Sequence, residues 1–185
     1  VTVTFERGVP VALNGEALGL VELLERAADI GCRHGVGIVD HIEDRIVGLK
    51  VRDIYEVPAA AIILTAHAEL ERLVGTIHQN QYKGDLDRQW GYLVYAGLWW
   101  EPLRENLDAY MDSVNERVTG TIGLKLFKGS VRAVTRESPN AVYDASLATF
   151  ETSGGLFSQQ ASPGFIELWS LQSRMAYRLK ASQED

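Results

Sequence analysis

The stretch "HIEDRIVGLKVRDIYEVP", from His41 to Pro58, narrows the ways in which this chain can fold. Between Glu43 and Glu56 it carries four acidic and three basic residues, interleaved with aliphatic side chains and one tyrosine. A solvated surface does not need the aliphatic residues, and a dry core does not tolerate unpaired charges. We therefore predict short strands that anchor their aliphatic residues in the core and present a polar site, over Ile38–Ile42, Ile46–Leu49 and Val51–Tyr55.

The rest of the chain mixes strand and helix patterns without a regular βαβ alternation. Strand patterns joined by tight turns open the sequence at Val1–Phe5 and Val9–Leu13, and a second hairpin is expected about "KGS" in "TGTIGLKLFKGSVRAVTRES". Helical spacing is predicted over Leu18–Cys32, Ala59–Val74 and Leu86–Val114, the last broken near Pro102. These patterns predict the α+β class, with a mixed or antiparallel sheet and helices packed against it.

Length and composition exclude several classes of protein. A chain of 185 residues fits one domain with an appended arm, and 46% hydrophobic and 23% charged residues are ordinary for a globular protein. The formal net charge of -7 argues against binding to nucleic acid or to an anionic membrane surface. The single cysteine, Cys32, excludes an internal disulfide and suits the cytoplasm. We expect neither a transmembrane segment nor a signal peptide.

Most common catalytic motifs are missing from the sequence. It contains no phosphate-binding loop of the form GxxxxGK[ST] and no nucleophile elbow, and "GVGIVD" lies in the wrong context for a dinucleotide fingerprint, so we interpret it as a turn. The four histidines show no metal-ligand spacing, so no metal site is expected. His67 lies in an apolar helical pattern and is predicted to be a core histidine. The charged stretch is the remaining candidate site, and a salt-bridged sheet edge is its competing interpretation.

Six blocks of the sequence resemble the argininosuccinate synthase family. In the order of that family they are "VTFERGVPVALNG", "RHGVGIVDHIEDRIVGLKVRDIYEVP", "GLWWEPLRENLDAYMD", "VTGTIGLKLFKGSV", "RESPNAVYDASLATFE" and "GFIELWSL". Family members often have Arg where Ile38 stands and Ser where Val51 stands, and neither position is assigned to substrate. The resemblance covers the C-terminal synthetase half only. The upstream domain of the ATP-pyrophosphatase type, with its "SGGLDTS" loop, is not in the sequence, so we expect a fragment.

The resemblance implies a carbon–nitrogen ligase of arginine biosynthesis and the urea cycle. In that family ATP activates citrulline as citrullyl-adenylate with release of pyrophosphate, and the aspartate amine then displaces AMP. ATP is implied as a co-substrate with Mg²⁺ in the full-length enzyme, and we expect this fragment to bind neither. The fragment alone is expected to be inactive and to bind citrulline weakly, because about half of the contacts to citrulline are made elsewhere.

The resemblance also assigns the substrate contacts. It places citrulline on Glu43 and Tyr55, and it implies no catalytic side chain and no metal ligand in this part of the family. A carboxylate and a phenol suit a ligand that carries an α-ammonium and a ureido group. Arg45, Lys50 and Arg52 are candidate supporting charges, either paired with neighbouring acids or directed toward phosphate, and we favour the pairing.

The end of the sequence resembles the oligomerisation tail of the family. "SGG" at Ser153–Gly155 predicts a linker, so we expect a synthetase domain over residues 1–153 and an oligomerisation tail over residues 154–185. Ser162 and Pro163 predict the start of a C-terminal helix that runs to about Lys180. The resemblance implies a homotetramer held in part by this helix, whose apolar side includes Phe165, Leu168, Trp169, Met175 and Leu179.

Two further expectations concern assembly. The aromatic run "WGYLVYAGLWW", which contains Trp90 and Trp100, is expected to lie in the core or in a subunit interface and not to form a cofactor site. The competing hypothesis for the function is a non-catalytic module that folds and oligomerises without the nucleotide-binding half.

Overall fold

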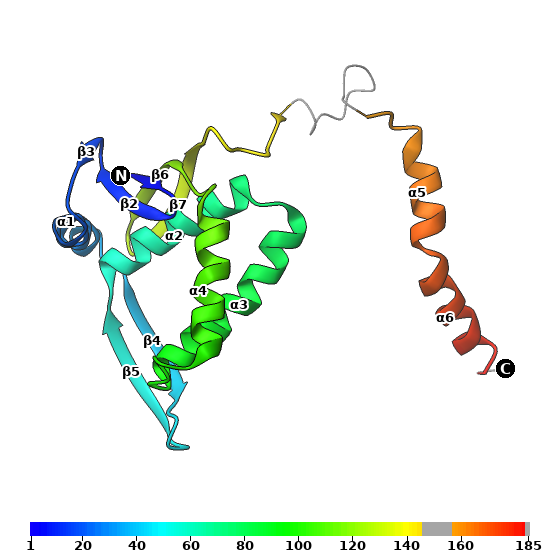
Figure 1. Ribbon diagram of the computed structural model, residues 1–185, viewed down its shortest axis with the longest axis horizontal. Coiled ribbons are helices and arrows are strands. Elements are labelled where there is room, and N and C mark those ends of the chain that lie inside the picture. Colours follow the sequence, from blue (N-terminus) through cyan, green and yellow to red (C-terminus); the bar gives the residue numbers. More distant parts are fainter. Residues whose placement is uncertain (146–156, 184–185) are drawn as a thin grey trace. The chain divides into compact units, whose positions relative to one another are not determined.

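Five antiparallel strands form the main sheet, in the order β3-β2-β1-β6-β7 (Figure 1). The structure, a computed structural model, describes residues 1–145 and 157–183. Each of three turns in the sheet has two successive residues with positive φ, the geometry of tight hairpins that match the strand twist. These turns are Arg7-Gly8, Asn14-Gly15 and Lys128-Gly129, and they join the strands β1 (Thr2–Glu6), β2 (Val9–Leu13), β3 (Glu16–Ala17), β6 (Gly120–Phe127) and β7 (Ser130–Glu137).

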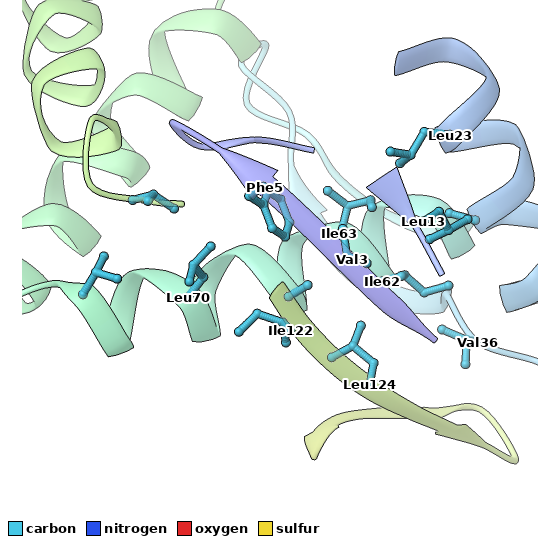
Figure 2. Packing of buried hydrophobic residues seen from close by; sticks show 14 residues of the cluster. Val3, Phe5, Leu13, Leu23, Val36, Ile62, Ile63, Leu70, Ile122 and Leu124 are labelled. Carbon is cyan, nitrogen blue, oxygen red and sulfur yellow. The ribbon is translucent and has the colours of Figure 1, made fainter. Parts of the chain in front are cut away.

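Helices α1 (Leu20–Arg33) and α2 (Pro58–Val74) contribute most of the helical residues of the core. The buried residues of α2 form one face, because Ile62, Ala66, Leu70 and Val74 recur every four positions and Ile63 lies beside them. In Figure 2 side chains of this face lie against Phe5 of β1 and Ile122 of β6, which are fully buried. The antiparallel sheet with helices confirms the predicted α+β class.

The predicted helix over Leu86–Val114 is two helices, and the first begins earlier than expected. They are α3 (Ile77–Tyr95) and α4 (Pro102–Asn115), so the predicted break before Pro102 is confirmed. The early start has a local cause: Thr76 Oγ1 accepts from the Gln79 backbone N–H, and the Gln79 side chain accepts from the Thr76 N–H. This capping box satisfies two backbone donors of the first turn.

A two-stranded antiparallel ribbon, β4 (Ile38–Asp44) and β5 (Lys50–Glu56), extends away from the main sheet (Figure 1). Its base is held at Gly37, where φ is +92° and an added Cβ would lie 2.5 Å from Pro58 Cα, so only glycine fits. The Gly37 carbonyl also accepts from the Val57 N–H at 2.8 Å. The turn expected in "GVGIVD" is therefore confirmed at Gly35–Gly37, whereas Ile38–Asp40 belong to β4, and this turn fixes the ribbon to the start of α2.

The predicted strand over Ile46–Leu49 is wrong, because these residues form the tip of the ribbon. The Arg45 and Leu49 backbones are joined by an N–H···O bond of 2.8 Å, and Gly48 has a φ of +83° that reverses the chain. The expectation that the aliphatic residues of this stretch lie in the core is also wrong. Ile42, Ile54 and Val47 are exposed, the last at 78%, because both faces of a lone two-stranded ribbon are open in this chain.

The chain divides into two compact units, Val1–Tyr143 and Asp144–Asp185. The predicted linker at Ser153–Gly155 and the predicted domain boundary after residue 153 lie outside the described residues. The single predicted C-terminal helix is two helices, α5 (Ala161–Trp169) and α6 (Leu171–Ala181), separated at Ser170. The N-cap residue is Gln160 and not Ser162, and it makes no side-chain capping bond. In the part of the chain that is described, no helix combines the length and the apolar character needed to cross a membrane.

Candidate functional site

The register of the ribbon divides its side chains between two faces. Directly opposed residues of an antiparallel pair lie on the same face, and the opposed pairs Val39–Tyr55, His41–Asp53 and Glu43–Val51 alternate along the ribbon with pairs that point the other way. We call the first set the Glu43–Tyr55 face. The predicted citrulline contacts therefore lie on one face, although twelve positions separate them in the sequence.

A compact polar group forms on the Glu43–Tyr55 face. The Tyr55 hydroxyl donates to Glu43 Oε2 at 3.0 Å and lies 3.4 Å from Asp53 Oδ2. His41 contacts both Glu43 and Tyr55: its Nε2 lies 3.4 Å from Glu43 Oε2, and its ring centroid lies 5.4 Å from that of Tyr55. The hydrogen bond to Glu43 raises the pKa of Tyr55, so the phenol stays protonated and remains a donor at neutral pH.

Arg45, at the end of β4, connects the two carboxylates of this group. Its Nε lies 2.8 Å from Glu43 Oε1 and its Nη2 lies 2.6 Å from Asp53 Oδ2. The hydrogen bond to Asp53, followed by the charge of Glu43, raises the pKa of Arg45. This guanidinium fixes the orientation of both acids, and only 18% of the Glu43 side chain stays exposed.

The other two candidate supporting charges point to the opposite face. Arg52 binds both oxygens of Asp40 through Nε and Nη2, at 2.8 and 2.5 Å. This pair lowers the pKa of Asp40. Lys50 pairs with Asp44, and both side chains are well exposed. Of the three bases, Arg45 therefore contacts the group around Glu43, and each of the three is paired with a carboxylate.

The charges on the Glu43–Tyr55 face leave an excess of one negative charge when His41 is neutral. Glu43 and Asp53 are acids, and within residues 1–145 and 157–183 Arg45 is the lysine or arginine that binds them. Such a group can accept hydrogen bonds from an ammonium or from ureido N–H donors, and the Tyr55 oxygen can accept a further one while its O–H is donated to Glu43. It offers no activated nucleophile. Among residues 1–145 and 157–183, no cluster of His, Cys, Asp and Glu is suited to a metal ion.

His67, predicted as a core histidine, lies edge-on to Phe5 with ring centroids 5.5 Å apart. Its Nδ1 is 3.5 Å from Glu71 Oε2, so it is part of a polar network beside the core and not of the candidate site.

The two ends of the aromatic run "WGYLVYAGLWW" differ in their exposure to solvent. Trp90 is half-buried and donates to Asp108 Oδ1 at 2.7 Å, whereas Trp100 is 83% exposed.

The sequence reasoning missed His41 and Asp53 as members of the polar group. A signal for both was available, because side chains two positions apart on a strand share a face. His41 is two positions from Glu43, and Asp53 is two positions from Tyr55. Their mutual pairing, however, follows from the ribbon register.

Comparison with known proteins identifies the family. Residues 1–176 match the family model described as "Arginosuccinate synthase C-terminal domain". Two similar relatives are the argininosuccinate synthases of Pyrococcus furiosus, 46% identical over 97% of this chain, and Methanocaldococcus jannaschii, 46% identical over all of it. That of Symbiobacterium thermophilum is 45% identical over 99% of the chain.

The matched region is the C-terminal domain of a synthase, and the relatives that carry it are argininosuccinate synthases. The chain belongs to the argininosuccinate synthase family. It spans less than half of the length of these relatives, namely 43%, 46% and 45%.

Proposed function

We propose that this chain supplies the citrulline-contacting part of an argininosuccinate synthase, which joins citrulline to aspartate at the expense of ATP. The observation that carries the proposal is the contact between Glu43 and Tyr55, whose side chains form one polar group with a bond of 3.0 Å. The identity of 46% to relatives of this name over nearly the whole chain supports the same assignment.

In the proposed reaction these residues bind and orient the substrate. The ureido oxygen of citrulline attacks the α-phosphate of ATP, pyrophosphate leaves, and the aspartate amine then displaces AMP. Both steps depend on holding charged reactants in line and need no nucleophile from a side chain. Glu43 accepts from citrulline, Tyr55 holds the Glu43 carboxylate from one side, and Arg45 holds it from the other.

ATP and Mg²⁺ belong to the proposed activity of the longer protein. On the described part of this chain no acidic or histidine cluster fits a metal ion, and Arg45, Lys50 and Arg52 are each paired with a carboxylate. We therefore assign neither the ion nor the nucleotide to these residues. Aspartate is likewise proposed as a substrate of the longer protein without a contact assigned here.

A chimera tests the proposal. Residues 1–185 replace the matching C-terminal part of the Pyrococcus furiosus enzyme, and AMP formation is measured with ATP, citrulline and aspartate. We expect AMP only when citrulline and ATP are both present, and argininosuccinate only when aspartate is added. A chimera that folds and binds ATP but forms no citrulline-dependent AMP would contradict the proposal.

A second candidate function is assembly. Helices α5 and α6 contain no buried residue, and their exposed side chains include Phe165, Leu168 and Trp169. Apolar helix faces of this kind are normally covered by another surface. We propose that a second copy of the chain covers them in a homo-oligomer, a tetramer in the full-length protein. The proposed division at residue 153 separates this tail from the synthetase domain.

The remaining assignments concern cellular context. We propose a cytoplasmic protein, because its one cysteine suits a reducing compartment. We expect no nucleic-acid or membrane partner, because the net charge of -7 repels both anionic surfaces.

A further inference from the structure

Histidine is the side-chain type whose charge ordinarily changes near neutral pH, and His41 is the histidine of the Glu43–Tyr55 face. Its Nε2 lies 3.4 Å from Glu43 Oε2, the same oxygen that accepts from the Tyr55 hydroxyl. A carboxylate oxygen has two lone pairs, so a third donor at Oε2 must compete for it. Glu43 Oε1 is already bound by Arg45 at 2.8 Å.

The protonation of His41 therefore changes both the donor count and the charge of the group. With neutral His41, the acids Glu43 and Asp53 outnumber the base Arg45 by one. With protonated His41, the charges balance and the attraction for a ligand cation is lost.

We propose that His41 is a specificity-determining residue that makes binding of an α-ammonium ligand at Glu43 depend on pH. Protonated His41 takes the place of the ammonium beside Glu43, and neutral His41 leaves that place to the ligand. The ligand class is a zwitterionic amino acid with a neutral polar side chain. The inference rests on the proposed function, in which this ligand is citrulline.

The charged and titratable neighbours of His41 are consistent with this role. On β4 they are Asp40 and Glu43, on β5 they are Asp53 and Tyr55, and Arg45 reaches the group from the ribbon tip. From α3, the Tyr95 hydroxyl lies 3.5 Å from the Asp44 carbonyl and close to Arg45. Carboxylates ordinarily remain ionised above about pH 5 and phenols remain neutral below about pH 9. Histidine is the side-chain type in this set whose charge ordinarily changes between these limits.

The test measures citrulline binding to the 185-residue chain by NMR, which detects millimolar affinities. Titrations are run at about pH 5.5 and about pH 8, a range in which histidine changes charge and citrulline does not. We expect affinity to fall about three- to fivefold at the lower pH, the size of an exposed ion-pair interaction. His41→Gln should bind equally at both pH values, at the affinity that the parent chain has at the higher pH.

Two further variants complete the design. His41→Lys places a permanent charge beside Glu43 and should bind weakly at both pH values. His78→Gln removes an exposed histidine on α3 and should keep the pH dependence of the parent chain. Because His41 lies on the exposed ribbon, backbone amide spectra are expected to confirm that every variant keeps its fold.

The outcomes separate this inference from the proposed function. If citrulline binds and His41→Gln keeps the parental pH dependence, the role of His41 is refuted while the proposed function stands. If His41→Gln fails to bind at the higher pH, His41 is a direct ligand contact, and the inference also fails. If citrulline binds to no variant at either pH, the inference is overturned, and the AMP assay of the chimera decides separately on the proposed function.

Discussion

Glu43 keeps little exposed surface although it lies on a ribbon with no sheet beside it. Arg45, Tyr55 and His41 surround its carboxylate and account for this shielding. Interactions at a shielded charge are stronger than those between fully solvated charges, because less water screens them. Substitutions here should therefore change ligand binding, while the distant core keeps the fold intact.

The first prediction concerns Glu43→Gln and Tyr55→Phe in the active chimera. Glu43→Gln removes a charge that faces a cation, so we expect the KM for citrulline to rise about tenfold or more. Tyr55→Phe removes the hydrogen bond that holds the Glu43 carboxylate but leaves its charge in place, so we expect a smaller rise of about three- to tenfold. The KM for ATP should change less than about twofold in both variants, because each substitution affects only the binding of citrulline.

The matched control is Asp40→Asn on the opposite face of the ribbon. It removes a charge paired with Arg52 and should leave the KM for citrulline unchanged. Equal effects of Glu43→Gln on all three substrates would instead indicate a structural role for the ribbon.

At the scale of elements, Lys83 joins α3 to α2. Its Nζ lies 2.7 Å from Glu71 Oε1 and 2.8 Å from Asp87 Oδ1, and its side chain is only 12% exposed. Lys83 therefore forms an ion pair with a carboxylate that is itself only 15% exposed. Burial alone would raise the pKa of Glu71, but the contacts with His67 and Lys83 outweigh it and lower this pKa.

The second prediction is that Lys83→Met lowers the free energy of unfolding by about 2–3 kcal/mol near neutral pH, because it removes the cation beside the shielded Glu71 carboxylate and leaves only the contact with His67. Arg88→Met, which breaks an exposed pair on the same helix, should cost less than about 0.5 kcal/mol. Urea denaturation measures both values.

The pH dependence of this loss follows from the lowered pKa of Glu71. A carboxylate whose pKa is lower in the folded state contributes stability at neutral pH, and this contribution is lost as the pH falls through the folded value. The difference between Lys83→Met and the parent chain should therefore narrow in acid. Equal losses for Lys83→Met and Arg88→Met would show that Lys83 is no more than a surface charge.

The third prediction concerns helices α5 and α6. Phe165 and Trp169 stack one turn apart, with ring centroids separated by 5.6 Å, yet both remain exposed. Helices this short are marginal unless an apolar face is buried. We expect the chain to be a dimer or tetramer by light scattering at tens of micromolar, and deletion of Ser162 to Asp185 should shift it toward monomer.

Point variants on these helices provide the control. Leu168→Lys places a charge on the apolar side and should weaken assembly, whereas Ala181→Lys, on the other side of α6, should not. A monomeric parent chain at this concentration would mean that the tail packs on its own subunit, and the interface proposal would fail.

At the scale of the whole molecule, the hydrophobic core of the described residues lies entirely within the first unit. It gathers residues from both ends of that unit, from Val3 of β1 to Leu124 of β6, around α2. The ribbon contributes no side chain to this core. Stability and the candidate site are therefore carried by different parts of the same unit.

The fourth prediction compares two isoleucines on opposite sides of this division. Ile122→Ala creates a cavity at a fully buried position and should lower the free energy of unfolding by about 2–4 kcal/mol. Ile42→Ala, at an exposed position on the ribbon, should change it by less than about 0.5 kcal/mol. Thermal or urea unfolding gives both values. A large loss for Ile42→Ala would mean that the ribbon face is covered in solution.

Local sequence determined the hairpins of the main sheet and the α+β class. The pairs Arg7-Gly8, Asn14-Gly15 and Lys128-Gly129 produce tight turns through short-range sterics, and these turns need no distant contact to be recognised. The period of the buried residues in α2 is likewise a local property. The family resemblance assigned Glu43 and Tyr55 as citrulline contacts, but it did not predict how their side chains are arranged.

Tertiary structure alone decided the composition of the polar group. A shift of one residue in the ribbon register would send every side chain of one strand to the other face, so pairing decides which charges meet. The register brings His41 and Asp53 beside Glu43 and sends Arg52 to Asp40 on the far side. The exposure of Ile42 and Ile54 could not be predicted from the sequence either. An aliphatic pattern indicates which residues can be buried, but it does not indicate whether another surface covers them.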